Sequence, residues 1–335
     1  MSKVALVTAR TRVYALVGLV AAGAAGVTVA VTVLTTHGEH HAASTTTTQT
    51  PATPPPLFLD LGVRTDPEAR ALRRAAALYQ QGRRAQAAAI FRRHRSLEAQ
   101  VGAALSAWPD TLYRMEALAR ADPASGAVQL NDGLALVQAG KLRAARAAWT
   151  KAKAGQPDSM YAIEADNFLH PNLAPGLPPF VPDFASPARL ARLSPPRQLA
   201  FLAARAGRGG DREKILYGVA LQSLGRPLSA EREFRAAAAL APDNPEARTA
   251  AAVGLFDKED PALAFGRLGP LTRVFPHAAT VRFHLGLMLL WLGRAEQGKA
   301  QLRLARAEAP GSRLAREAER FLARLAGGGT KQRKR

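Results

Sequence analysis

Between residues 211 and 312, apolar positions recur at the spacing of an α-helix, in stripes that alternate with short polar turns. Two stripes and their turns form one unit, and the unit repeats every 34 residues: Pro242, Pro276 and Pro310 follow one another at this interval. A fixed period of this length is typical of a solenoid, in which each helix pair buries its apolar face on the next pair. The pattern therefore predicts an all-α chain of antiparallel helix pairs.

Small residues fall at matching places in these units. Gly218, Ala252 and Gly286 lie one period apart, as do Ala230, Ala264 and Gly298. Such positions indicate that the two helices of a pair cross closely, because added methylene groups there would cost about 1–3 kcal/mol through overpacking.

A period of 34, small residues at the crossing and a proline after the second helix resemble the tetratricopeptide repeat (TPR) family. The unit at 279–311 carries the resemblance through Leu285, Gly286, Leu289, Gly293, Leu302, Ala305 and Pro310. The unit at 126–159 carries it through Gly133, Leu136, Gly140, Ala145, Trp149, Ala152 and Pro157. The resemblance implies a TPR-like α-solenoid, and it names no reaction.

Composition divides the chain into six parts. They are a cytoplasmic N-terminus and transmembrane anchor at 1–36, a Ser/Thr/Pro-rich flexible spacer at 37–64, an N-terminal TPR-like helical block at 65–169, a Pro-rich linker at 170–196, a C-terminal TPR array with a capping helix at 197–326, and a basic disordered tail at 327–335. The eight prolines of 170–196 exclude one continuous helix. A linker is favoured there, and docking of Phe180, Val181 and Phe184 onto a helical block is the alternative.

The anchor is predicted from residues 13–34, which contain 22 residues without a charge. This length can cross the hydrocarbon of a bilayer as one helix. Lys3, Arg10 and Arg12 precede it, so the pattern predicts a single-pass protein of the bacterial cell membrane, with its N-terminus cytoplasmic and its TPR domain extracytoplasmic. A cleaved signal peptide, with small residues at 22–24, is the alternative.

Charge and composition narrow the functional classes. The chain has no cysteine, which excludes thiolate chemistry and disulfides. Its net charge of +20 comes mainly from arginines scattered over helix faces, so direct nucleic-acid binding is not expected. His37, His40 and His41 beside Glu39 are interpreted as part of a polar stalk rather than a metal site. No motif of a hydrolase, metalloprotease or phosphate-binding loop is present, and neither an enzyme nor a cofactor is predicted.

Recognition by the concave face is the remaining function. In the TPR family the first helix of each pair lines this face, and the resemblance places a largely apolar lane there. The predicted partner groove consists of Ile215, Val219, Gln222, Thr249, Val253, Phe256, Phe283, Leu287 and Trp291. The slots that hold lysine and asparagine in carboxylate-clamp members are apolar or threonine here, so an amphipathic or hydrophobic segment is the expected partner.

Three alternatives stay open. The lane could be covered internally, by the closing helix at 313–326 or by the Pro-rich segment. The second alternative is that the basic surface binds an anionic lipid or a cell-wall polymer. The third is that the chain is a regulatory subunit of a membrane enzyme. The scaffold is favoured: a membrane-anchored, extracytoplasmic protein that organises other proteins through an apolar groove.

Overall fold

The computed structural model describes residues 53–330, with side chains to residue 326, and this range contains helices and no β-strand. The prediction of an all-α chain is confirmed for this range. In chain order the helices are α2 (Pro67–Gln80), α3 (Arg84–Phe91), α4 (Leu97–Ser106), α5 (Thr111–Ala121), α6 (Gly126–Gln138), α7 (Leu142–Gly155), α8 (Met160–Leu169), the 3-10 helix η1 (Ala188–Arg192), α9 (Pro195–Ala206), α10 (Asp211–Ser223), α11 (Pro227–Leu240), α12 (Pro245–Gly254), α13 (Pro261–Leu268), α14 (Leu271–Val274), α15 (Ala279–Trp291), α16 (Ala295–Glu308) and α17 (Arg313–Thr330).

Successive helices form antiparallel pairs, such as α6–α7, α10–α11 and α15–α16. The turn inside a pair carries a glycine with positive φ: Gly140, Gly225 and Gly293 have φ between 66° and 73°. Such a backbone suits glycine because it has no Cβ. Where α10 and α11 cross, Gly218 lies against the ring of Phe234, which leaves no room for a Cβ. The predicted close crossing is therefore present.

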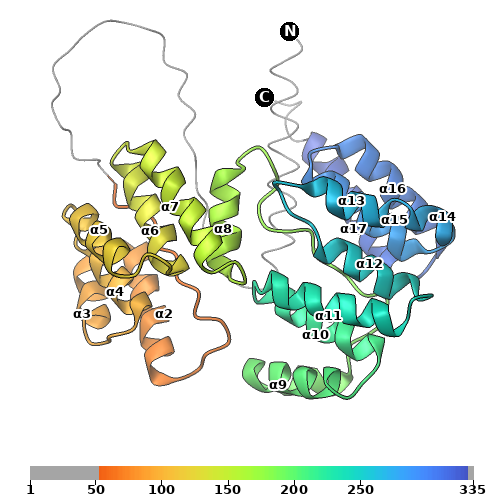
Figure 1. Ribbon diagram of the computed structural model, residues 1–335, viewed down its shortest axis with the longest axis horizontal. Coiled ribbons are helices and arrows are strands. Elements are labelled where there is room, and N and C mark those ends of the chain that lie inside the picture. Colours follow the sequence, from red (N-terminus) through yellow and green to blue (C-terminus); the bar gives the residue numbers. More distant parts are fainter. Residues whose placement is uncertain (1–52, 331–335) are drawn as a thin grey trace, which may run out of the picture.

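The helices form two groups, which Figure 1 shows side by side. We call α2–α8 the N-terminal block and α9–α17 the C-terminal block. The N-terminal block has two apolar clusters, one around Phe91 and one around Trp149, and the C-terminal block has one, which contains Phe180 and Phe283. In the C-terminal block, the helix that pairs with α12 is divided into α13 and α14. The division lies at Pro270, because proline cannot donate the next helical hydrogen bond.

Polar contacts join the two blocks. The carboxylate of Asp158 accepts hydrogen bonds from the N–H groups of Leu228 (2.9 Å) and Ser229 (3.1 Å), at the start of α11. The Lys153 ammonium reaches from α7 to Asp257 (3.4 Å) and Glu259 (3.2 Å), before α13. These contacts fix α8 against the C-terminal block.

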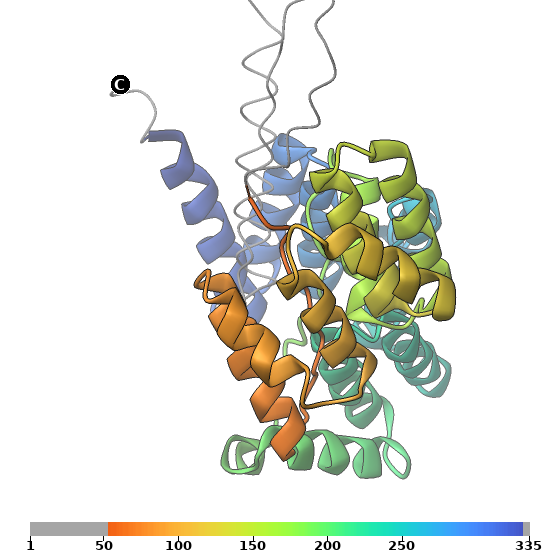
Figure 2. The ribbon, with the colours of Figure 1, turned by 90° about the vertical axis from the view of Figure 1, so that its left-hand side faces the viewer.

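Two extended segments pack on the helices and differ from the predicted spacer and linker. We call residues 53–61 the N-terminal strap and residues 174–184 the central strap. Leu57 and Leu61 of the first and Phe180 of the second are buried. Figure 2 shows the N-terminal strap, in orange-red, as an extended chain that runs past the first helices. Prolines prevent helix formation in both segments, while apolar side chains between the prolines supply surface to bury.

The closing helix α17 covers the end of the array through Leu314, Ala318 and Phe321, which are buried. It reaches Thr330 and so extends into the segment predicted as a disordered tail. Once a helix is packed along one face, each further residue adds one backbone hydrogen bond at low cost. Residues 331–335 lie outside the described residues.

The predicted membrane localisation is corrected. Among residues 53–330, no helix has the length and apolar character needed to cross a membrane. Residues 13–34, on which the single-pass prediction depended, lie outside the described residues, as do His37, His40 and His41. The single-pass, extracytoplasmic assignment is therefore withdrawn.

Candidate binding site: two straps on the inner face

The inner face of each block is formed by the first helix of each pair. In the N-terminal block α2, α4, α6 and α8 lie next to one another in that order. In the C-terminal block the corresponding row is α10, α12, α15 and α17. Each row has one strap lying across it.

The residues predicted to line a partner groove are all buried or half-buried, and several share a core cluster with the central strap and α17. Ile215, Thr249, Val253, Phe256, Phe283, Leu287 and Trp291 are buried, and Val219 and Gln222 are half-buried. Ala174 and Phe180 of the central strap belong to the same core cluster, and the ring of Phe321 from α17 packs edge-on against Phe283 with centroids 6.1 Å apart. In this structure the predicted groove residues form the floor of a groove that the central strap and α17 fill.

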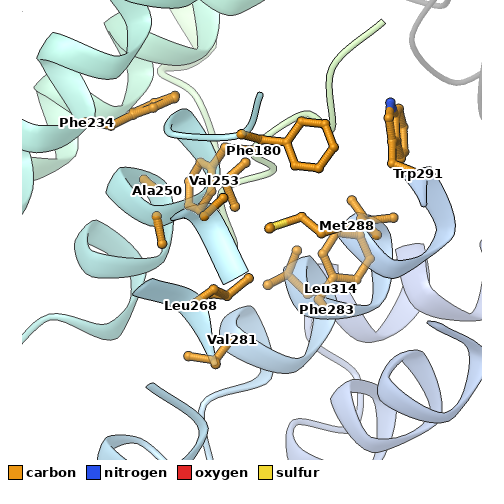
Figure 3. Packing of buried hydrophobic residues seen from close by; sticks show 14 of the residues in the cluster. Phe180, Phe234, Ala250, Val253, Leu268, Val281, Phe283, Met288, Trp291 and Leu314 are labelled. Carbon is orange, nitrogen blue, oxygen red and sulfur yellow. The ribbon is translucent and has the colours of Figure 1, made fainter. Parts of the chain in front are cut away.

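Phe180 is the deepest side chain of the central strap. It is 2% exposed and lies among side chains from α11, α12 and α15 (Figure 3). Its ring stacks on the imidazole of His284, with centroids 4.5 Å apart, and tilts against Phe234 at 5.6 Å. Burying a side chain of this size contributes about 1.5–3 kcal/mol.

His284 binds the backbone of the central strap. Its Nδ1 lies 2.7 Å from the carbonyl oxygen of Thr280, and its Nε2 lies 2.9 Å from the backbone nitrogen of Val181. Because the carbonyl can only accept and the backbone N–H can only donate, the imidazole is neutral with its proton on Nδ1. Complete burial lowers the pKa of His284 to about 4, which keeps this form at neutral pH.

Further polar contacts hold the strap on either side of Phe180. The Gln222 amide accepts from the Phe180 N–H (2.8 Å) and donates to the Pro178 carbonyl (3.2 Å). The Asp183 N–H donates to Glu246 on α12, and the Asp183 carboxylate accepts from the Leu314 N–H (3.1 Å) at the start of α17. The strap thus contacts all four helices of its row.

The N-terminal strap is held in a similar way. The Asn131 side chain accepts from the Phe58 N–H (2.9 Å) and donates to the Phe58 carbonyl (2.8 Å). The Tyr79 hydroxyl donates to the Pro55 carbonyl (2.5 Å), and the Tyr161 hydroxyl accepts from the Asp60 N–H (3.0 Å). The helices α2, α6 and α8 therefore bind backbone groups of this strap.

The carboxylate of Asp60 connects this strap to the other block. Its Oδ2 lies 3.2 Å from Nη1 of Arg226, the residue before α11. The Asp60 side chain is 10% exposed and that of Arg226 36%. An ion pair with one partner this well shielded is screened less by salt than a surface pair.

A second polar cluster lies at the junction of the blocks. Ligand atoms of Asp166, His170 and Glu259 are within 4.8 Å of one another. The Lys153 ammonium already lies 2.9 Å from Asp166 and 3.2 Å from Glu259. The lysine supplies the positive charge that these carboxylates require, so the cluster is interpreted as an ion-pair network rather than a metal centre.

The predicted groove includes Gln222 but neither His284 nor Asn131. Both residues carry a signal, because each is a polar side chain near the middle of the first helix of a pair. Each also stands two residues before the crossing glycine, Gly133 or Gly286. A buried polar side chain requires a partner, and here the strap backbone is that partner.

Comparison with known proteins gives limited information. No family model and no curated protein matches the chain. Among solved structures it is similar to YrrB, described as a TPR protein with an unusual peptide-binding site (18% identity, TM-score 0.30, 62% of this chain and 97% of that chain). It is also similar to the APC/C hetero-tetramer Cut9–Hcn1 (15%, 0.26, 77% and 55%) and to the P58(IPK) TPR domain (12%, 0.27, 80% and 82%). At these TM-scores the likeness adds nothing to the geometry described above.

Proposed function

We propose that the chain is a protein-interaction scaffold whose inner faces bind extended segments of protein. The observation that carries the proposal is that both inner faces hold an extended segment through its backbone. Asn131 and Tyr161 bind the N-terminal strap, and Gln222 and His284 bind the central strap. Backbone hydrogen bonds with apolar anchors between them are a general way of recognising extended peptides.

The predicted groove residues have a defined place in this proposal. The apolar floor supplies binding energy, since it buries anchors such as Phe180. Gln222 supplies orientation, because its amide bonds both a donor and an acceptor of the strap. A segment of another protein that displaced a strap would meet the same floor and the same polar groups.

A selection from a library of random peptides tests this function. The target is the full chain with Leu57→Ser and Leu61→Ser, changes that remove the two buried leucines of the N-terminal strap. We expect enrichment of extended apolar peptides that lose binding when Asn131→Ala is added. The matched control is Asn172→Ala, because Asn172 is exposed. If no enriched peptide depends on Asn131 while circular dichroism shows intact helices, the inner face is not a peptide-binding site.

A further inference from the structure

The two straps share a sequence pattern. Residues 55–61 read Pro-Pro-Leu-Phe-Leu-Asp-Leu, and residues 178–184 read Pro-Pro-Phe-Val-Pro-Asp-Phe. Both fit Pro-Pro-Φ-Φ-x-Asp-Φ, where Φ is an apolar residue. Burial follows the same order over the first four positions: the first proline and the third residue are buried in both straps, and the second and fourth residues are half-buried.

The helices that receive the straps correspond as well. Tyr79, Gly82 and Phe91 of the first pair match Gln222, Gly225 and Phe234, each 143 residues later. Asn131 and Ser159 match His284 and Ser312, each 153 residues later. The two serines perform the same role, because each hydroxyl accepts the N–H of the residue three positions on, at the start of α8 and α17.

The contacts coincide at two positions of the pattern, the first proline and the fourth residue. The carbonyl of the first proline accepts from Tyr79 in one block and from Gln222 in the other. The N–H of the fourth residue donates to Asn131 or to His284. At the aspartate the groups differ: the Asp60 N–H donates to the Tyr161 hydroxyl of α8, whereas the Asp183 carboxylate accepts from the Leu314 N–H of α17. At the first proline and the fourth residue, equivalent residues therefore bind equivalent backbone groups.

Each position of the pattern has a physical reason. The prolines keep the segment extended and bring no N–H that a buried site would have to satisfy. The third residue fills an apolar pocket of the inner face, as Leu57 and Phe180 do. The carboxylate meets a positive partner: Arg226 for Asp60, and the N-terminal end of α17 for Asp183.

The two grooves differ in how firmly the occupant is held. The third residue of the pattern is the larger Phe180 in the central strap, where its ring also stacks on His284. In the N-terminal strap the third residue is the smaller Leu57, which buries less apolar surface. The N-terminal strap is therefore the easier of the two to displace.

We infer that the groove of the N-terminal block binds a Pro-Pro-Φ-Φ-x-Asp-Φ segment of another protein in place of residues 55–61. The inference rests on the proposed function and specifies its ligand. The N-terminal strap then competes with the partner for the groove. The net free energy of binding is the difference between that of the partner segment and that of the strap, so the strap lowers the apparent affinity for the partner.

A synthetic peptide with the sequence of residues 53–63, labelled with a fluorophore, provides the test. Anisotropy is measured with the full chain carrying Leu57→Ser and Leu61→Ser. We expect saturable binding that weakens about tenfold or more when Asn131→Ala is added, and similarly when the peptide carries asparagine in place of Asp60 or serine in place of Leu57. The wild-type chain should bind the same peptide more weakly, because its own strap competes.

A second measurement avoids reliance on the double variant. The same peptide, with a photo-crosslinking residue at the half-buried position of Phe58, is irradiated with the wild-type chain. Crosslinks in α6 or α8 support displacement of the strap. The absence of crosslinks there, together with no anisotropy change for a folded double variant, overturns the inference.

Other outcomes separate this inference from the proposed function. If a scrambled peptide binds as well as the pattern, or if the library yields Asn131-dependent peptides of another pattern, the scaffold stands and the recognition pattern is wrong. If light scattering shows a dimer that Asn131→Ala dissociates, the groove takes the strap of a second copy, and the partner assigned here is wrong. If no peptide of any pattern binds, both proposals fail.

Discussion

Asn131 and His284 occupy the same position in two helix units that lie 153 residues apart, and they make the same two contacts. Each side chain donates to the carbonyl four residues earlier in its own helix, Ala127 at 2.8 Å and Thr280 at 2.7 Å. Each then accepts an N–H of a strap at 2.9 Å. The bond inside the helix fixes the side chain, so the acceptor is already oriented when the strap arrives.

The difference between an amide and an imidazole predicts a pH dependence for one block. His284 titrates near 6.5 when unfolded, and burial lowers its pKa to about 4 in the folded chain. Between these values the unfolded state binds more protons, so stability is lost as the pH falls from about 6.5 through 4. The total contribution is about 3 kcal/mol.

Denaturant unfolding of the wild type and of His284→Asn at several pH values measures this pH-dependent contribution of His284 to the free energy of unfolding. The wild type should be the more stable at pH 7.5, and the difference should shrink by about 3 kcal/mol as the pH approaches 4. If the two stability curves run parallel, the neutral imidazole is not what binds Val181.

Asp132 should show the opposite dependence. Its side chain is 6% exposed, and its Oδ1 has no hydrogen-bond partner among the described residues. Burial, with the nearby charge of Glu116, raises its pKa from 3.8 to about 6. The folded state then binds more protons between these values, so stability falls as the pH rises through this window.

Replacing Asp132 by asparagine should therefore raise the free energy of unfolding at pH 7.5, by about 2 kcal/mol. The gain should disappear near pH 4, where the carboxyl group is protonated in the folded chain. Equal stabilisation at both pH values would show that the ionised carboxylate is not the source of the penalty.

The close helix crossings predict a graded cost of added side chains. A Cβ at Gly133 would overlap the Trp149 indole, so Gly133→Ala should lower stability by about 1–3 kcal/mol. At Gly286 the nearest atom, Cγ of Leu302, lies 3.0 Å from a Cβ, so Gly286→Leu should lower the melting temperature markedly. Gly266 on α13 has nothing within 4 Å of a Cβ, and Gly266→Ala should be neutral or stabilising by up to about 1 kcal/mol. Thermal unfolding followed by circular dichroism ranks the three variants.

At the junction between the blocks, Asp158 of the N-terminal block caps the start of α11 in the C-terminal block. The N-cap of α11 is Arg226, whose side chain makes no cap hydrogen bond, and Asp158 binds the first N–H groups instead. Asp158→Ala should cost about 0.5–2 kcal/mol, as loss of a helix cap does. Asp243→Ala, at an exposed aspartate, is the control. Equal stability of the two variants would show that Asp158 does not cap α11.

The regular part of this fold could be predicted from the sequence because its interactions are local. Gly218 and Phe234 lie on two paired helices that one short turn joins, so their separation along the chain is nearly constant from pair to pair. The 34-residue repeat of small residues therefore predicts the close crossing. The period does not show that the second helix of one unit is divided into α13 and α14, a division that the structure places at Pro270.

The site could not be predicted in the same way, because its contacts join distant parts of the chain. Phe58 meets Asn131 73 residues away, and Val181 meets His284 103 residues away. Proline and threonine around these segments are typical of linkers, and no periodicity marks where an extended chain will pack. The recurrence of Pro-Pro-Φ-Φ-x-Asp-Φ was a signal available in the sequence, although only the structure shows what it contacts.

The placement of the N-terminal strap has a consequence for synthesis on the ribosome. Asp60 is translated 101 residues before Tyr161, its partner on α8. At about 5–20 residues per second, the strap waits roughly 5–20 s for its groove to be completed. During this time Phe58 and the Asp60 N–H lack their contacts with Tyr161, and the prolines at 54–56 limit pairing with another chain because they offer no backbone donor. A nascent chain that stalls before α8 therefore carries a strap whose leucines can already pack on α2–α6, and completion of α8 adds the contacts of Phe58 and Asp60 with Tyr161.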